Sequence, residues 1–590
     1  MWTSGGRSRA PSTGRRTRLS ARLRSAPIGS ERGVLISISQ ELLHRGLVTK
    51  DALSDASALQ RKEGLRLDHA LVQLGHVTER QMLEVVGAQL SLDVVDLETV
   101  EIEQSTLDLL PSKLVHRKRL VPLSRAKGKL RVVTSDAYDL SALDEIYLLT
   151  GLTVEPVLAP EEDIDKVIKT RYGLGGDTID EMVEGNDLRL PAGVEDNEDL
   201  LEMAQEASVI KLVNEIIVEA IHERASDIHI EPYEKELSIR YRIDGVLQKA
   251  SLPSQIHRFQ AAIISRLKIL ADLNIAEKRL PQDGRIKFQV GGRGIDVRVS
   301  VIPMLFGEGI VMRILDQANV LYMLTDLGMD DSSFRVFHSL IQRPHGILLV
   351  TGPTGSGKTT TLYAALNAIV GPEKKVLTVE DPVEYHLEGV NQIPVDHKVG
   401  MTFERGLRAI LRHDPDVVMI GEVRDLETAE AAIQAALTGH LVLSTLHTND
   451  SASAATRLID MGVEPFLVSS TLVGAMAQRL VRSNCAACVE DYKPKPETLP
   501  ADFTWTGDTP LRHGVGCREC RGTGYRGRTG LYELMTMTPA VAQGIMDRVP
   551  SNVLVDAAKK GGLRLLREDG WVKVLGGVTT PDEVLRCTAE

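Results

Sequence analysis

The chain has 590 residues, of which 43% are hydrophobic and 25% are charged, and its formal net charge is −12. This length is too great for one hydrophobic core and predicts about three or four domains. Its apolar runs are shorter than the roughly 18–20 residues of a membrane-spanning helix. The acidic balance argues against nucleic-acid binding as the main activity, so we expect no nucleic-acid partner.

Residues 1–33 are rich in Arg, Ser, Thr and Gly, and we interpret them as a disordered tail. Seven arginines and no acidic residue lie in the first 30 positions, so the remaining chain is more acidic than the total charge indicates. A transit peptide has a similar composition, and a start codon assigned too early would also produce such a segment. The apolar core of a secretory signal is missing.

Residues 34–175 are predicted to form an N-terminal regulatory or docking domain, made of a helical repeat and an α+β region. The segments "SQELLHRGLVTKDAL" (39–53) and "DHALVQLGHVTERQM" (68–82) align with one another. In each copy an apolar helix ends at a glycine and a threonine begins the next helix. The acidic residues 176–200, which contain scattered Gly and Pro, are predicted to be a linker.

Residues 201–318 are predicted to be a second N-terminal α+β domain. The segment "SVIKLVNEIIVEAI" (208–221) places its apolar residues on one helical face, and alternating runs such as "LSIRYRI" and "IDVRVSVI" predict strands. From about residue 330, short and wholly apolar runs alternate with helical segments, which is the pattern of a buried parallel sheet. These runs are "GILLVTG", "KVLTVED", "VVMIGE" and "HLVLSTL".

A phosphate-binding loop follows the first of these apolar runs. Residues 352–359 read Gly-Pro-Thr-Gly-Ser-Gly-Lys-Thr, which matches GxxxxGK[ST] in full between a strand and a helix. Its backbone N–H groups and the helix N-terminus suit a phosphate, Lys358 is expected to reach the β- and γ-phosphates, and Thr359 is expected to bind Mg²⁺. The predicted ligands are therefore ATP and Mg²⁺, and the residues assigned to them are Gly352, Pro353, Thr354, Gly355, Ser356, Gly357, Lys358, Thr359 and Thr360.

The stretch "VVMIGEVRD" (417–425) has the shape of a Walker B strand with an unusual acidic residue. Most P-loop nucleotidases keep a magnesium-holding aspartate there, whereas this chain has Glu422. In isolation this leaves open whether the stretch belongs to a nucleotide site. Beside a P-loop it becomes the expected next strand, because ligands bind at the carboxyl ends of parallel strands.

Two further stretches place polar side chains at strand ends. "TVEDPVEY" (378–385) supplies Glu380 and Glu384, whose carboxylates can polarise an attacking water molecule; the alternative is a solvated acidic turn. "TGHLVLSTLHTND" has His440 and His447 at the two ends of a strand. One of them is expected to be an ordinary core histidine, and His447 is the better candidate for sensing the γ-phosphate.

Four of the five cysteines form two CxxC pairs. Cys485 and Cys488 are separated by 28 residues from Cys517 and Cys520. Two such pairs in tandem predict a structural Zn²⁺ site with four thiolate ligands, and a redox function of the CxxC motifs is the alternative. We assign no function to Cys587.

Together, the P-loop, "TVEDPVEY", "MIGEVRD" and "TGHLVLSTLHTND" resemble the Walker A, Asp box, Walker B and His box of the secretion ATPase superfamily. The nearest branch is that of the type II secretion and type IV pilus assembly ATPases, in which a glutamate is normal at the position of Glu422. The resemblance implies an α/β fold with a RecA-like P-loop ATPase domain at 319–480, preceded by α+β N-terminal domains. A small zinc-binding lobe at 481–535 and a C-terminal helical segment at 536–590 complete the expected organisation.

The segments "ERASDIHIEPYE", "RYRIDG", "EKRLPQDGRI" and "IDVRVS" are similar to the second N-terminal domain of that family. Family members work as hexamers in which arginines of this domain reach the nucleotide and stabilise the transferred phosphate. The resemblance makes Arg298 and Arg313 the first candidates for this role. Arg408, Arg412 and Arg424 are the next candidates.

The resemblance implies an ATPase that forms a homohexamer and powers pseudopilus or pilus assembly for type II protein secretion. Its expected partners are the inner-membrane platform and cytoplasmic-domain proteins of such a machine. The expected location is the cytoplasm, with peripheral association at the inner membrane. A type IV pilus assembly (extension) ATPase is the main alternative, whereas the retraction ATPases usually lack the four-cysteine insert and a DNA-translocating motor is disfavoured by the acidic composition.

The repeat at 36–90 also resembles the paired motif by which some of these ATPases bind cyclic di-GMP. The second copy keeps "RLDHALVQLG", but Asp68 stands where a glycine is usual. The first copy has Ser37 and Ile38 where Arg and Leu are expected. These departures favour docking onto a membrane partner over ligand binding, and regulation by cyclic di-GMP stays an alternative.

Overall fold

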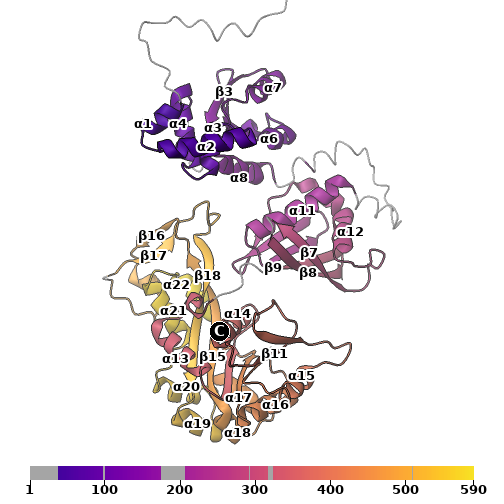
Figure 1. Cartoon of the computed structure of the whole chain (residues 1–590), viewed down its shortest axis with the longest axis vertical. Coiled ribbons are helices and arrows are strands. Elements are labelled where there is room, and N and C mark those ends of the chain that lie inside the picture. The colour runs from indigo at the N-terminus through magenta and orange to yellow at the C-terminus, as the bar shows by residue number, and fades with distance from the viewer. Residues whose placement is uncertain are drawn as a thin grey trace, which may run out of the picture. The chain divides into compact units, whose positions relative to one another are not determined.

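A computed structural model describes residues 38–97, 100–173, 178, 206–290, 293–316, 323–507 and 509–589. The chain divides into two compact units, of which the first comprises residues 1–110 and 118–166 and the second the rest (Figure 1). The predicted tail at 1–33, and the predicted linker at 176–200 apart from Thr178, lie outside the described residues. Within the described ranges, no helix combines the length and the apolar character that a membrane crossing requires.

In the N-terminal unit, both repeat copies have the helix caps that the sequence predicts. Gly46 and Gly75 have φ angles of 67° and 73°, in the left-handed region that favours glycine. Thr49 caps the second helix, and Thr78 forms a reciprocal capping box with Gln81 at the fourth. A three-stranded sheet of order β1-β2-β3 follows. The elements of residues 38–171 are α1 (Ile38–His44), α2 (Lys50–Glu63), α3 (Leu67–Gln73), α4 (Glu79–Leu90), α5 (Gln104–Leu107), α6 (Ser112–Lys118), β1 (Leu120–Ala126), β2 (Lys129–Thr134), α7 (Leu140–Thr150), β3 (Thr153–Leu158) and α8 (Glu161–Arg171).

The next domain is an antiparallel sheet of six strands in the order β6-β5-β4-β9-β8-β7. Leu212, Ile216 and Ile217 of its first helix are buried against this sheet, as the one-sided apolar pattern predicts. Its elements are α11 (Ala207–His222), β4 (Asp227–Pro232), β5 (Leu237–Ile243), β6 (Val246–Lys249), α12 (Gln260–Leu270), β7 (Gln282–Val290), β8 (Arg293–Met304) and β9 (Gly307–Asp316).

The nucleotide domain contains a seven-stranded sheet of order β12-β11-β13-β14-β10-β15-β18, in which β18 alone is antiparallel to its neighbour. Alternate residues of β10 (Gly346–Thr351) are buried in two different cores. Ile347 and Leu349 belong to the core with α15–α18, and Leu348 and Val350 belong to the core with α13 and α14. This two-sided burial explains why the predicted strands are wholly apolar.

The helices and strands of the central part follow the expected alternation, which confirms the α/β fold class. They are α13 (Asp331–Ile341), α14 (Lys358–Ile369), β11 (Val376–Glu380), β12 (Val390–Pro394), α15 (Phe403–Ile410), β13 (Val417–Ile420), α16 (Leu426–Leu437), β14 (Leu441–Leu446), α17 (Ala452–Asp460) and α18 (Pro465–Thr471).

The long strands β15 (Leu472–Asn484) and β18 (Tyr525–Thr536) lie side by side at one edge of the sheet (Figure 1). The segment between them carries the four cysteines and a small two-stranded sheet. The cysteine segment is therefore an insertion between two strands of the nucleotide domain. The remaining elements are β16 (Val489–Tyr492), β17 (Leu511–Gly514), α19 (Pro539–Met546), α20 (Ser551–Lys559), α21 (Leu566–Leu575) and α22 (Pro581–Thr588).

Candidate nucleotide and metal sites

The P-loop connects β10 to α14 and its lysine is the first residue of that helix. The Lys358 Nζ donates to the carbonyl oxygens of Gly352 (2.8 Å) and Pro353 (3.2 Å). Gly352 has a φ of 143°, and a Cβ there would lie 2.5 Å from the carbonyl oxygen of Gln478, so only glycine fits. Burial lowers the pKa of Lys358, nearby Glu422 opposes this and Arg479 reinforces it. The loop thus offers a helix N-terminus and an ammonium group to a phosphate.

Glu422 follows β13 and lies between two cationic or polar partners. Its carboxylate is 2.5 Å from Arg424 Nη2 and 3.3 Å from His447 Nε2. Burial alone would raise the pKa of Glu422, but the hydrogen bond and charge of Arg424 and the nearness of His447 outweigh it, so this pKa is lowered. The structure therefore brings together two of the predicted site residues, and it holds Glu422 as a carboxylate.

Glu380, at the end of β11, lies in a different environment. It is only 3% exposed, and its carboxylate accepts hydrogen bonds from the Tyr363 hydroxyl, from Thr378 Oγ1 (2.6 Å) and from Gln392 Nε2 (3.0 Å). Burial, with the neighbouring Glu380 charge, raises the pKa of Tyr363, which keeps its hydroxyl a donor. No sequence pattern indicated Tyr363 or Gln392, because a helix tyrosine and a strand glutamine carry no motif.

Glu384 is more accessible and meets one of the candidate arginines. The Arg298 guanidinium lies 2.9 Å from the Glu384 carboxylate and donates to the carbonyl oxygen of Val383 (3.3 Å). Arg313 is the cross-strand neighbour of Arg298, but it pairs with Asp227 of its own domain at 3.0 Å. Of the two arginines, Arg298 therefore contacts the acidic loop beside the P-loop.

The other candidates have local partners. Arg408 pairs with Glu404 at 3.0 Å and Arg412 donates to the Arg408 carbonyl oxygen at 2.7 Å, both along the same stretch of chain. His440 lies at the start of β14, where its Nδ1 is 2.8 Å from the Ala435 carbonyl oxygen. His440 thus occupies the structural position expected for one of the two histidines, and His447 lies at the end of the strand beside Glu422.

The four cysteines of the insertion come together. Their sulfur atoms all lie within 4.8 Å of one another, and the pairs Cys485–Cys517, Cys488–Cys520 and Cys517–Cys520 are each 3.8 Å apart. A tetrahedral zinc site with Zn–S bonds of about 2.3 Å has sulfur atoms about 3.8 Å apart along each edge. The donor set therefore fits Zn²⁺, which would crosslink the two CxxC turns of the insertion.

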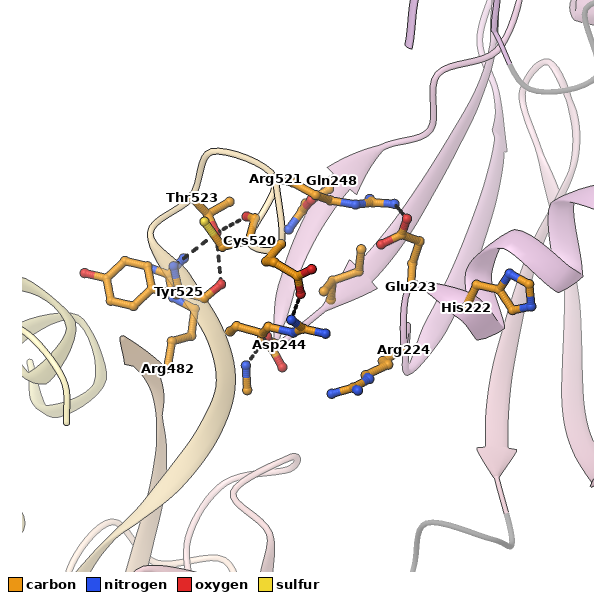
Figure 2. A pocket seen from close by; sticks show the side chains of 14 residues that line it. His222, Glu223, Arg224, Asp244, Gln248, Arg482, Cys520, Arg521, Thr523 and Tyr525 are labelled. Atoms are coloured by element: carbon orange, nitrogen blue, oxygen red, sulfur yellow. Dashed lines mark hydrogen bonds and ion pairs between the residues drawn. The ribbon is translucent and has the colours of Figure 1, made fainter. Parts of the chain in front are cut away.

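The turn after the second cysteine pair lines a cleft with the α11–β6 region (Figure 2). Arg521 pairs with Glu223 at the end of α11, and the backbone N–H of Gly527 donates to Asp244 at 2.8 Å. The Arg482 guanidinium stacks 4.1 Å from the centre of the Tyr525 ring. Charged side chains dominate this cleft, and none of the predicted nucleotide-binding residues lines it.

Comparisons with known proteins show what this chain is similar to. The family model described as "Type II/IV secretion system protein" matches residues 202–586, and the MshEN domain model matches residues 90–178. The type IV pilus assembly ATPase PilB of Myxococcus xanthus is 41% identical over 562 residues, which cover 94% of this chain and 99% of the relative. The type II secretion system protein E of Xanthomonas campestris is 42% identical over 570 residues, covering 95% and 100%. The ATPase DotB of Legionella pneumophila, a solved structure, is 22% identical with a TM-score of 0.46 and covers 63% of this chain and 93% of that one.

Proposed function

We propose that this chain, which belongs to the type II/IV secretion system protein family, is the hexameric motor that powers pseudopilus assembly for type II secretion. The chain is an ATPase. The observation that carries the proposal is that the P-loop, His447 and Glu422 follow three neighbouring parallel strands, β10, β14 and β13, with His447 Nε2 3.3 Å from the Glu422 carboxylate. Two relatives named type II secretion system protein E match 95% and 80% of this chain.

The residues around the P-loop have different roles in hydrolysis. Lys358 binds the β- and γ-phosphates. Thr359 and Glu422 would hold Mg²⁺, which would neutralise charge on the phosphate chain. Glu384 orients and deprotonates the attacking water, because its carboxylate is partly exposed, whereas the carboxylate of Glu380 is enclosed by hydrogen-bond donors of the core. Arg298 stabilises charge on the γ-phosphate once a nucleotide separates it from Glu384.

Glu380 has a supporting role in this proposal. Its carboxylate is buried and already accepts three hydrogen bonds, so it is poorly placed to take a proton from water. The same bonds tie β11 to α14 and β12 and thereby fix the loop that ends in Glu384. We therefore propose that Glu380 positions Glu384 rather than contacting the nucleotide.

An ATPase assay tests the proposal directly. We expect hydrolysis by the full chain, stimulation by the cytoplasmic domain of a platform protein together with acidic phospholipid vesicles, and a hexamer in light scattering. Glu422→Gln should reduce kcat by at least about 10²-fold while nucleotide affinity changes little. Glu427→Gln, a nearby exposed position on α16, is the matched control with wild-type turnover. Wild-type kcat in Glu422→Gln would refute the assigned role.

Type IV pilus assembly is the second candidate. It is favoured by the PilB relative of Myxococcus xanthus, whose identity and coverage are close to those of the type II relative. Deleting the gene in the cell that carries it distinguishes the two functions. Deletion should abolish export of secreted proteins with surface pili retained if the type II assignment holds, and the reverse result assigns the chain to pilus extension.

Regulation by cyclic di-GMP is a proposal for the repeat at 36–90, which directly precedes most of the MshEN match at residues 90–178. The repeat arginine, Arg66, is paired with Asp68 and lies 2.7 Å from the Asp136 carboxylate. Two carboxylates on this guanidinium compete with an anionic ligand. Asp68→Gly should therefore bind cyclic di-GMP more tightly than the wild type in calorimetry, and equal affinity would show that Asp68 does not compete with the ligand for Arg66.

A further inference from the structure

The short loop that follows His447 is held from two sides by charged residues of the edge strands. Arg479 of β15 donates from Nη2 to the carbonyl oxygen (3.3 Å) and the side-chain Oδ1 (3.1 Å) of Asn449. Glu533 of β18 accepts from the backbone N–H (2.9 Å) and the hydroxyl (2.7 Å) of Ser451. Residues 449–451 connect β14, which ends beside His447, to α17.

These two residues are diagonal neighbours on one face of the β15–β18 pair. Ala477 lies opposite Glu533, and Arg479 lies opposite Leu531. Residues that face each other across antiparallel strands share a face, so Arg479 and Glu533 project to the same side of the sheet. Arg479 donates to the loop and Glu533 accepts from it, so the loop cannot shift without breaking hydrogen bonds to both strands.

Arg479 differs from the other arginine of the same strand, Arg482, in its hydrogen-bond partners. Within the described part of the chain its guanidinium forms no ion pair and donates only to oxygens of Asn449 and Gln478. Arg482, three residues along the same strand, instead makes bonds of 3.0 and 2.8 Å to the Glu583 carboxylate. Because Glu583 belongs to α22, Arg482 holds that helix on the strand. The half-buried guanidinium of Arg479 donates only to oxygens of a loop and of its own strand, so it is suited to holding the loop in place.

The same segment of β15 also supports the P-loop. Gln478 is 2% exposed and its Oε1 accepts from Thr361 of α14 at 2.8 Å, while its backbone lies against Gly352. The Arg479 guanidinium in turn donates to the Gln478 carbonyl oxygen at 3.1 Å. One strand segment therefore contacts both the phosphate-binding loop and the loop after His447.

We propose that Arg479 and Glu533 are positioning residues for hydrolysis, which set the place of His447 relative to Glu422 and the P-loop. This inference rests on the proposed ATPase site and assigns it two residues that none of its motifs contains. The two residues touch no reacting atom; they act through the loop at 449–451. Their loss is expected to slow the chemical step and to leave nucleotide binding by the P-loop nearly unchanged.

A double-mutant cycle on the full chain tests the inference. Arg479→Gln should lower kcat about tenfold, with the affinity for a fluorescent ATP analogue within about twofold of wild type. Arg479→Lys, which keeps the charge, should recover part of the loss. In a His447→Ala background, Arg479→Gln should cost less than about twofold more, because the group that it positions is gone. Glu533→Gln should show the same dependence on His447.

Arg482→Gln is the matched control, because it removes the same charge from the same strand. It should lower the melting temperature at least as much as Arg479→Gln and leave kcat per folded molecule unchanged. Additive effects of Arg479→Gln and His447→Ala would overturn the inference, as would a wild-type kcat in His447→Ala. In either case, hydrolysis that still depends on Lys358 would leave the proposed ATPase function standing.

Discussion

The nucleotide core and the cysteine insertion organise their functional groups in different ways. In the core, the groups sit at the ends of strands whose side chains are buried on both faces, so the sheet itself fixes their spacing. Between Cys485 and Cys520, the only buried apolar residues besides these cysteines are Phe503 and Leu511 in the part that the structure describes. We therefore expect the core to be stable without its ligand and the insertion to depend on a metal crosslink, because so little apolar surface is buried there.

The largest expected effect comes from removing the P-loop ammonium group. Lys358→Ala should reduce kcat by at least about 10³-fold, since no other cation of the loop replaces its contact with the transferred phosphate. The melting temperature should change little, because Lys358 bonds only to loop carbonyl oxygens. A phosphate-release assay measures the first and differential scanning fluorimetry the second. Lys374→Ala, at an exposed position, should behave as wild type, and hydrolysis retained by Lys358→Ala would disprove the site.

The converse experiment removes one sulfur ligand from the insertion. In Cys488→Ser, hydrogen exchange should show an unfolded segment between β15 and β18, because the metal site supplies most of its folding free energy. Basal ATP hydrolysis should persist, since none of the nucleotide-binding motifs lies there. Export or pilus assembly should fail if the cysteine insertion binds the inner-membrane platform protein.

Metal analysis provides the control for that experiment. The wild-type chain should hold one Zn²⁺, Cys488→Ser should hold less, and Cys587→Ser should hold as much as wild type, because Cys587 donates to the Leu480 carbonyl oxygen away from the cluster. A wild-type chain free of zinc after purification under reducing conditions would contradict the assignment. So would full activity of Cys488→Ser in the cell.

The two regions also differ in how far their sequence revealed them. Motifs predicted the P-loop, Glu422 and the four cysteines, because each is a residue type with a fixed local spacing. The hydrogen bonds of Glu380 with Tyr363 and Gln392, and those of Arg479 with Asn449, join positions that are 12 to 30 residues apart along the chain. Such contacts depend on strand order, and the spacing of one residue type does not encode strand order. The insertion's placement between two sheet strands was missed for the same reason.

Arg298 and Arg313, which face each other on β8 and β9 of the preceding domain, allow a catalytic role to be distinguished from a structural one. Arg298→Ala should lower kcat about 10- to 100-fold, the cost of one charged hydrogen bond to the transferred phosphate, with the melting temperature nearly unchanged. Arg313→Ala should in addition destabilise its domain, because it leaves the buried Asp227 carboxylate short of a partner. Steady-state kinetics and thermal melts on both variants separate these outcomes. Equal melting temperatures with equal kcat losses would place both arginines at the nucleotide.

The smallest expected effect lies where β15 leaves the core for the insertion. Glu583 of α22 is 1% exposed and binds Arg482 and Arg586. Burial alone would raise its pKa, but these arginines lower the pKa of Glu583 to about 2. Because the folded pKa is depressed, the ion pairs stabilise the fold above the ordinary glutamate pKa of about 4.3, and the contribution is lost as pH falls towards 2.

Glu583→Gln should therefore lower stability at pH 7 by about 1–3 kcal/mol, and its deficit should shrink between pH 4.5 and about 2. Melting temperatures measured across this pH range give the comparison, with Glu490→Gln as a matched variant at an exposed position. A deficit independent of pH would mean that packing, rather than charge, holds α22 on the strand. In that case apolar packing would stabilise this end of β15 as it stabilises the core. The part of the chain that we expect to depend on a metal would then start at Cys485.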